Sequence, residues 1–282
     1  GQLSNTFARR SEQAFADHER FRLAMVAQHP DDLAEKLKLV MEQCARGPEG
    51  GEFLERRGIF LGEVPHSRPR VAFMFSGQGS QYPQMLRALV EEFPPAAAAL
   101  RELDAELTQR GYPDFADLAW EHFEALGADL WRTQLSILVA STILAASLKA
   151  LEIRPDCISC LSYGEFPALV AAGAWTFAAA ARATDARCKI VEQCRGEEGA
   201  MLAVPLGQAA LQELCREVGP RLYVANVNAA DQTVAGGDAD SIARLAAHLR
   251  SKRIASRRLK IPHAFHTPLM KPVTTPFREV LR

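Results

Sequence analysis

The sequence has no excess of charge of either sign and no long apolar run. Its 282 residues contain 33 Lys and Arg against 34 Asp and Glu, so the formal net charge is −1. A balanced charge provides no field for gathering nucleic acid or coating an anionic membrane. The apolar runs are shorter than the roughly 18 residues that favour a transmembrane helix. We therefore expect neither nucleic acid nor membrane as a partner.

The N-terminus lacks the apolar core of a secretory signal. It begins with Gly1 in place of methionine, which indicates a piece cut from a longer protein. Cysteine is scarce, and only Cys157 and Cys160 have the C-x-x-C spacing of a redox pair or half a zinc site. Neither a second C-x-x-C nor a nearby histidine completes four ligands. We expect buried structural cysteines, no metal, and a cytoplasmic, reducing location.

The first 68 residues carry no recognisable catalytic pattern. Residues 11–46 predict two helices broken at His29–Pro30, and residues 57–62 predict a short strand. We interpret residues 1–68 as a packing or linker segment.

Two further regions differ in the expected order of strands and helices. In residues 69–198, strands at 71–75 and 157–160 each run into a turn and alternate with helical patterns, which predicts a parallel sheet covered on both faces. Residues 199–262 predict the order strand, helix, strand, strand, helix, strand, which is the ferredoxin-like pattern. Residues 263–282 then return to the larger unit. The expected fold is α/β, with two lobes and a cleft between them.

The candidate nucleophile is Ser162, which lies between a predicted strand and the helix expected at 165–173. A serine in such a turn is lifted above the sheet, and Gly164 permits the tight packing that the turn requires. The spacing S-x-G is common by itself, and Cys160 stands where the motif usually has its first glycine.

A second glycine turn, residues 76–81, follows the strand at 71–75. Its backbone can approach a ligand closely, and the N–H of Gln78 can supply an oxyanion donor. A phosphate-binding loop is the rival interpretation, but no lysine follows the glycines as that motif requires.

A serine nucleophile also needs a base. Of the seven histidines, His263 and His266 lie where the small lobe rejoins the large one. From there His266 can reach Ser162 as a general base and then a general acid. A metal pair at this spacing lacks carboxylate companions, whereas an ordinary loop histidine remains open on spacing alone.

Together these motifs resemble the acyltransferase domains of type I polyketide synthases and the malonyl-CoA:acyl carrier protein transacylases of fatty acid synthesis. Residues 75–81 (F-S-G-Q-G-S-Q) resemble the family's F-P-G-Q-G-S-Q motif, and residues 160–165 (C-L-S-Y-G-E) resemble its G-H-S-x-G-E elbow. Residues 263–266 (H-A-F-H) end in the position of its catalytic histidine. The likeness covers roughly residues 70–275. It implies an α/β-hydrolase-like large lobe with an inserted ferredoxin-like lobe.

The resemblance also implies an activity, namely transfer of a malonyl unit from malonyl-CoA to the phosphopantetheine arm of an acyl carrier protein, through an acyl-serine, in polyketide biosynthesis. Ser162 and His266 would be catalytic, and the N–H groups of Gln78 and Tyr163 would hold the oxyanion. No cofactor is implied. Residues 1–68 would join a ketosynthase to this domain, so other synthase domains are expected partners, and Tyr163 hints at an iterative synthase.

Substrate contacts follow from the same resemblance. Arg187, 25 residues beyond the serine, would pair with the malonyl carboxylate, and Gln134 matches a family glutamine. Phe265 would crowd an α-methyl branch and so favour malonyl over methylmalonyl. The remaining predicted substrate-binding residues are Leu161 and His263.

Three departures leave alternatives open. Leu161 replaces a histidine, Ser76 a proline and Cys160 a glycine, and the family's later segment that orients the histidine would follow residue 282. A serine hydrolase of acyl thioesters is one alternative, although such an enzyme has little use for a buried Arg187. A catalytically degenerate domain with a structural role is another.

Overall fold

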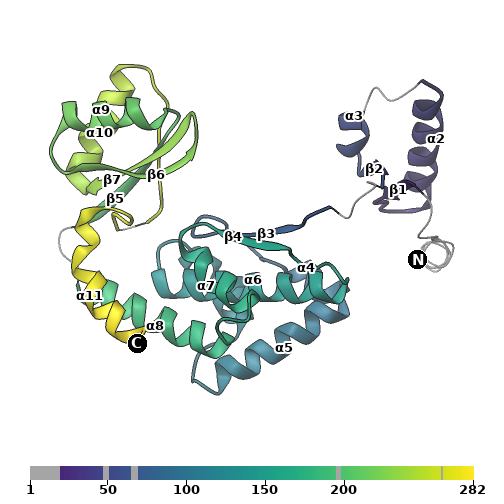
Figure 1. The fold of residues 1–282 in the computed structure, drawn as a ribbon, viewed down its shortest axis with the longest axis horizontal. Helices are drawn as coiled ribbons and strands as arrows, with labels where there is room; N and C mark the ends of the chain where they lie inside the picture. The colour runs from purple at the N-terminus through teal and green to yellow at the C-terminus, as the bar shows by residue number, and fades with distance from the viewer. Residues whose placement is uncertain (1–19, 47–50, 65–68, 195–197, 262) are drawn as a thin grey trace. The chain divides into compact units, whose positions relative to one another are not determined.

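The computed structural model describes residues 20–46, 51–64, 69–194, 198–261 and 263–282. The chain divides into two compact units, residues 1–70 and 71–282. Figure 1 shows the elements of both units.

The first unit is a two-stranded antiparallel sheet with two helices. Strand β1 (Phe21–Met25) pairs with β2 (Ile59–Glu63), and helices α2 (Pro30–Arg46) and α3 (Gly51–Glu55) lie between them in the chain. Val40, Leu54 and Ile59 form its small buried core.

One expectation for this unit is wrong. The first of the two predicted helices is absent over residues 21–25, which pair with β2 as strand β1. Backbone pairing with a distant strand overrides the local helical pattern, and residues 11–19 lie outside the described residues. The second helix begins as expected at Pro30, with Asp31 and Asp32 in its first turn.

The second unit begins with the large lobe. Strands β3 (Ala72–Phe75) and β4 (Cys157–Cys160) are parallel neighbours, and Phe75 lies opposite Cys160 at their carboxyl ends. The helices of this lobe are α4 (Arg87–Glu92), α5 (Pro94–Thr108), α6 (Leu130–Ala150), α7 (Glu165–Ala171) and α8 (Phe177–Gln193), with short helical turns at Asp117–Glu121 and Phe123–Ala125.

Helix α6 is the centre of the large lobe. It has 21 residues and is the one helix in the described part of the chain that is long and apolar enough to cross a membrane. Leu135, Leu138 and Ile143 on it are nevertheless fully buried in the main apolar core, and α5, α7 and α8 pack around it. We therefore interpret α6 as a core helix. Asp129 caps its N-terminus by accepting a hydrogen bond from the Arg132 N–H at 2.8 Å.

The prediction of a sheet covered on both faces is wrong for the described residues. Helix α7 contacts β3 and β4, but Met74 on the opposite face is 82% exposed. Cys157 shares that open face, and Cys160 ends β4 at the surface, so both thiols are exposed. The prediction that this C-x-x-C pair is buried is therefore also wrong, because Cys157 faces the uncovered side of the sheet and Cys160 stands at the exposed end of its strand, whereas Cys188 and Cys215 are buried.

The small lobe has the ferredoxin-like arrangement. Its elements are β5 (Gly199–Val204), α9 (Gln208–Val218), β6 (Leu222–Ala229), β7 (Gln232–Asp238), α10 (Ala239–Ser251) and β8 (Arg257–Arg258). The strands form one antiparallel sheet in the order β6-β7-β5-β8. Leu211 on α9 and Leu245 on α10 are buried against Leu202 of β5, so both helices cover one face of the sheet.

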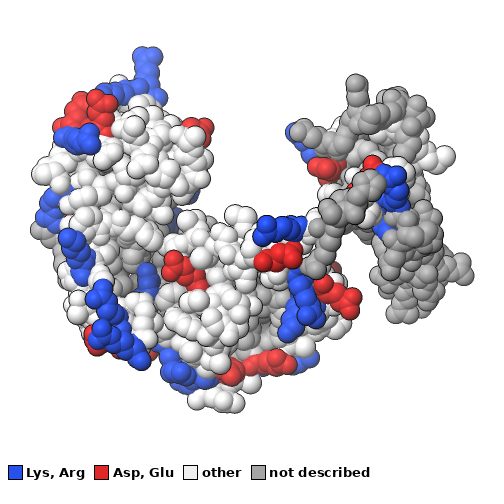
Figure 2. Space-filling view, viewed as in Figure 1, with Lys and Arg blue, Asp and Glu red and all other residues white. Residues whose placement is uncertain are grey.

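The two lobes share an apolar cluster. Leu130, Cys188 and Val191 come from the large lobe, and they pack with Met201 and Val234 of the small lobe sheet. The chain then returns through a turn at Pro268–Met270 and helix α11 (Lys271–Val280), which lies beside α8 (Figure 1). Figure 2 shows basic and acidic side chains interspersed on the visible face, with wide uncharged areas between them.

Two glycines let the ends of β3 and β4 approach closely. A Cβ atom on Gly77 would lie 2.6 Å from the Leu161 carbonyl oxygen, and one on Gly164 would collide with the Phe75 carbonyl. Neither glycine is replaceable without moving a backbone segment. The turn after β3 is therefore fixed against the turn that carries Ser162.

We expect Gly164→Ala to destabilise residues 71–282 by about 1–3 kcal/mol, the usual cost of forcing extra volume into a packed site. Thermal unfolding followed by circular dichroism would show a Tm several degrees lower. Gly219→Ala is the matched control, because a Cβ there makes only an ordinary 3.5 Å contact with the end of Arg244. Equal Tm values for the two variants would contradict the assignment of Gly164 as a close-approach position.

Candidate active site

Ser162 occupies a strained turn between β4 and α7. Its backbone φ is 53°, in the left-handed region that a non-glycine residue adopts only when its surroundings enforce it. The Leu161 carbonyl accepts a hydrogen bond from the Gly164 N–H at 2.9 Å, which closes the turn over Ser162. Strain of this kind gathers at functional sites, and here it directs the serine side chain away from the packed core.

In the structure the predicted base, His266, lies next to the predicted nucleophile, Ser162. The Oγ atom of Ser162 and the Nε2 atom of His266 are 2.8 Å apart, although 104 positions separate the residues in sequence. His266 also has a positive φ, 60°, in the loop that leaves the small lobe. A serine hydroxyl within hydrogen-bonding distance of an imidazole is the geometry that activates a nucleophile.

The environment of His266 favours the neutral imidazole. Partial burial lowers its pKa below the usual value, and the positive charge of Arg187 lowers it further. The carboxylate of Glu165 acts in the opposite direction. The net lowering leaves His266 unprotonated near neutral pH and able to accept a proton from Ser162.

The predicted oxyanion donors lie in the two turns that meet at the strand ends. A Cβ on Gly77 would lie 3.4 Å from the Tyr163 nitrogen, so the turn that carries Gln78 contacts the turn that carries the nucleophile. The Tyr163 side chain points elsewhere. It is buried, stacks on Phe166, and shares a 2.7 Å hydrogen bond with Thr184. Only the backbone of Tyr163 is therefore available to a substrate.

A chain of side-chain hydrogen bonds connects Arg187 to the glycine turn. The NH1 group of Arg187 donates to Gln134 Oε1 at 2.8 Å, and Gln134 Nε2 donates to Gln78 Oε1 at 3.2 Å. Gln134 is completely buried on α6. The Arg187 guanidinium also lies over the Phe265 ring, 5.1 Å from its centre. Four predicted site residues thus form one connected group.

Arg187 is a partly buried cation whose hydrogen-bond and ring partners are neutral. Burial lowers its pKa, although a guanidinium remains protonated in proteins. Within the described ranges no carboxylate forms an ion pair with it. A partly buried charge without a counter-ion is unfavourable, so the site is suited to a ligand that brings a carboxylate.

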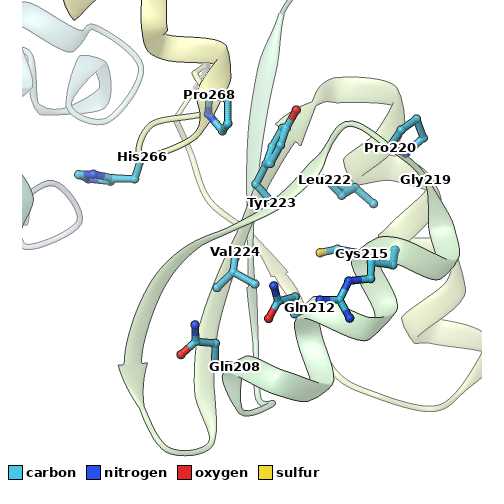
Figure 3. Close-up of a pocket in the computed structure, with 11 residues that line it drawn as sticks. Gln208, Gln212, Cys215, Gly219, Pro220, Leu222, Tyr223, Val224, His266 and Pro268 are labelled. Carbon is cyan, nitrogen blue, oxygen red and sulfur yellow. The ribbon is translucent and has the colours of Figure 1, made fainter.

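Two cavities adjoin His266. One, of about 400 Å³, is lined by Arg187, Phe265 and His266 together with apolar side chains, including Met270, Val273 and Phe277. The other, of about 640 Å³, lies on the small lobe between α9 and β6 and also reaches His266 (Figure 3). His266 therefore forms part of both walls.

Two predicted substrate residues lie outside the hydrogen-bonded group. The Leu161 side chain is 52% exposed beside Ser162. His263 is buried, with its ring 5.4 Å from that of Phe265. His263 therefore contacts Phe265, which lines the smaller cavity, but His263 does not line that cavity.

The sequence reasoning missed several residues of the site. Cys188 lies one position after Arg187, and its thiol contacts Gln134 Oε1 at 3.5 Å while burial raises its pKa to about 12. Glu165 affects the pKa of His266. Met270, Val273 and Phe277 line the smaller cavity. They are three and four residues apart, and this spacing in the sequence could have indicated that they share one face of a helix.

Comparisons with known proteins agree with this geometry. Residues 72–282 match the family model described as acyl transferase domain. Polyketide synthase GfsA of Streptomyces halstedii is 34% identical over 205 residues, covering 72% of this chain and 3% of that protein. The acyltransferase domain from the second module of the salinomycin polyketide synthase superposes with a TM-score of 0.73 at 28% identity, covering 92% of this chain and 58% of that one.

A further solved structure is a malonyl transacylase in complex with its type II polyketide synthase acyl carrier protein. Its TM-score is 0.68 at 28% identity, over 76% of this chain and 70% of that one. The chain thus belongs to the acyl transferase domain family, and the sequence-based expectations of this family, of an α/β fold and of an acyltransferase are confirmed. It spans only 3% to 12% of the curated synthases GfsA and nscA that it matches.

The lowered pKa of His266 is testable with a fluorophosphonate, which reacts with an activated serine and carries no carboxylate for Arg187. Because only the neutral imidazole accepts the serine proton, we expect the labelling rate of Ser162 to rise with pH, with a midpoint below the usual histidine value of about 6.5. Arg187→Gln removes a cation and should move this midpoint to higher pH. Glu165→Gln removes an anion and should move it lower. Shifts of the two variants in the same direction would contradict this electrostatic account.

Proposed function

We propose that the protein takes a malonyl unit from malonyl-CoA and passes it to the phosphopantetheine thiol of an acyl carrier protein. The observation that carries the proposal is the 2.8 Å contact between Ser162 and His266, together with the partly buried Arg187, whose side chain lines a cavity with His266. The first two residues suit transfer through an acyl-serine, and the third suits an acyl group that ends in a carboxylate.

The reaction has two matched halves. His266 takes the hydroxyl proton as Ser162 Oγ attacks the thioester carbonyl, and the N–H groups of Gln78 and Tyr163 hold the oxyanion. The C–S bond breaks, and His266 returns the proton to the departing thiolate of coenzyme A. The carrier thiol then gives its proton to His266 and attacks the malonyl-serine ester. Ser162 regains its proton as the new thioester forms.

Arg187 would hold the malonyl carboxylate through both halves. Gln134 fixes the guanidinium from one side and the Phe265 ring supports it from another, so little side-chain freedom is lost on binding. Each half exchanges one ester or thioester for another of similar energy. The chemistry therefore requires no metal or redox cofactor.

The neighbours named above support the wider setting. We propose that the domain works in polyketide biosynthesis in the cytoplasm, with residues 1–68 as a linker to a ketosynthase. We also propose lobe boundaries at residues 69–198, 199–262 and 263–282. The solved complex of a malonyl transacylase with its carrier protein supports an acyl carrier protein as the acceptor.

Intact-mass measurement after incubation with malonyl-CoA tests this function. We expect a malonyl adduct on the parent protein and none on Ser162→Ala. Arg187→Ala should load malonyl about 10- to 150-fold more slowly, the range for losing a hydrogen bond to a charged group, without slowing acetyl loading. Arg182→Ala, an exposed arginine on the same helix, is the matched control.

The other outcomes identify the alternatives. Absence of an adduct from the parent protein would support a degenerate structural domain. Rapid release of free malonate without transfer to the carrier thiol would support a thioester hydrolase. Either result would overturn the proposal.

Phe265 gives a second prediction, on selectivity. Its side chain lines the smaller cavity, so an α-methyl branch should be disfavoured by about 10- to 200-fold in kcat/KM. Phe265 is also 7% exposed within the cluster between the lobes, so we choose Phe265→Leu to limit the loss of packing. Competition between malonyl-CoA and methylmalonyl-CoA should show a smaller preference for malonyl in this variant. Equal loading of both substrates by the parent protein would disprove the role of Phe265.

A further inference from the structure

The thiol of Cys188 has no role in the steps above, although it lies beside the residue that would hold the malonyl carboxylate. Cys188 follows Arg187 on α8, is 2% exposed, and packs in the cluster between the two lobes. It lines neither of the two cavities beside His266. Because burial raises its pKa to about 12, the group is a protonated S–H donor at neutral pH. Any role of this thiol in the reaction therefore acts through a neighbouring side chain.

That neighbour is Gln134. The Sγ atom of Cys188 lies 3.5 Å from Gln134 Oε1, and the NH1 group of Arg187 donates to the same oxygen at 2.8 Å. An amide oxygen has two lone pairs, and these two donors, from consecutive positions of α8, occupy both. Gln134 is completely buried on α6, so bulk water does not reach the oxygen to replace a lost donor. The thiol thus supplies the second of two hydrogen bonds to one buried acceptor.

The two donors also fix which way the amide faces. Half a turn of the Gln134 amide would place its NH2 group against the guanidinium and the thiol, and donors do not pair with donors. With the oxygen held on the α8 side, Nε2 of Gln134 faces Gln78 Oε1 at 3.2 Å. Without the Cys188 donor, the oxygen would be held by Arg187 alone. The amide and the guanidinium could then move together, because each is the other's main support on that side.

We infer that Cys188 is a positioning residue for malonyl selection, because its S–H group holds Gln134 Oε1 and the fixed amide aligns the Arg187 guanidinium with the substrate carboxylate. This inference rests on the proposed function. An acetyl group has no carboxylate, so acetyl loading does not use the alignment. Cys188 therefore adds to the preference for malonyl over acetyl without touching either acyl group.

Loading of malonyl-CoA and acetyl-CoA by two variants tests this role. Cys188→Ala removes the donor and leaves a small void, whereas Cys188→Val removes the donor and fills the space. We expect each variant to lower the ratio of kcat/KM for malonyl-CoA to that for acetyl-CoA by about threefold, within the range for one hydrogen bond between neutral groups. An unchanged ratio in Cys188→Val would assign Cys188 to packing and overturn the inference.

Two further variants complete this comparison. Cys188→Ser keeps a donor at the same position, so its ratio should lie closer to that of the parent protein than to that of Cys188→Val. Cys215→Val is the matched control, because Cys215 is also a buried thiol but belongs to the core of the small lobe. It should leave the ratio unchanged. An equal fall of the ratio in Cys215→Val would show a general loss of packing and would count against a specific role of Cys188.

A double variant shows whether the thiol acts through the guanidinium. In Arg187→Ala the group that Cys188 is inferred to align is missing. Adding Cys188→Val to Arg187→Ala should therefore lower the malonyl-to-acetyl ratio no further, which is the non-additivity expected of two residues in one hydrogen-bonded network. A further threefold fall in the double variant would mean that Cys188 affects malonyl by another route, and the positioning role would be rejected.

Direct binding separates this inference from the proposed function. Ser162→Ala cannot form an acyl-serine, so calorimetric titration with malonyl-CoA and with acetyl-CoA measures the preference without transfer. Malonyl-CoA should bind at least about tenfold more tightly, and adding Cys188→Val should reduce that preference about threefold. The same preference with and without Cys188→Val would reject the role of Cys188 even if the malonyl adduct forms. A reduced preference without any adduct on the parent protein would keep the role of Cys188 in carboxylate binding and reject the transferase function.

Discussion

The contact between Ser162 and His266 depends on how the two lobes pack together. His266 follows Phe265, and Phe265 is buried in the cluster formed by Val191 of the large lobe and Met201 of the small lobe, among others. The hydrogen bond is directional and weak by itself, whereas apolar burial is what fixes one lobe against the other. The distance between Ser162 and His266 therefore depends on the packing of Phe265, the residue that precedes His266. Any change that loosens Phe265 also loosens the base.

A second constraint is electrostatic. The partly buried charge of Arg187 favours a carboxylate ligand, and the same charge lowers the pKa of His266. A malonyl carboxylate bound to Arg187 would offset that charge, so the imidazole would become more basic once substrate is present. Gln134 is suited to its place because a neutral amide orients the guanidinium without neutralising it. An acid at this position would hold Arg187 as firmly but would compete with the substrate.

The sequence predicted the parts of this structure that depend on local pattern and missed those that depend on distant packing. The order of elements in the small lobe follows from periodicity alone, and the turns around Gly77 and Gly164 from their glycines. The strand at Phe21 and the exposure of Cys157 depend on segments remote in sequence, so local propensity could not reveal them. Arg187 came from a resemblance, because an arginine on a helix is ordinarily an exposed charge. Its hydrogen bond to the buried Gln134 became visible only in three dimensions.

The departures in the Ser162 turn can be explained by the space around each position. Gly164 has no room for a side chain because the Phe75 carbonyl lies against it. Cys160 replaces the other glycine of the motif and ends β4 with its side chain exposed, so the thiol displaces nothing. Leu161 is likewise half-exposed beside the nucleophile. The turn tolerates substitutions at positions whose side chains face outward. It does not tolerate them at its close-packed glycines, Gly77 and Gly164, and these flank the strained Ser162 with its positive φ.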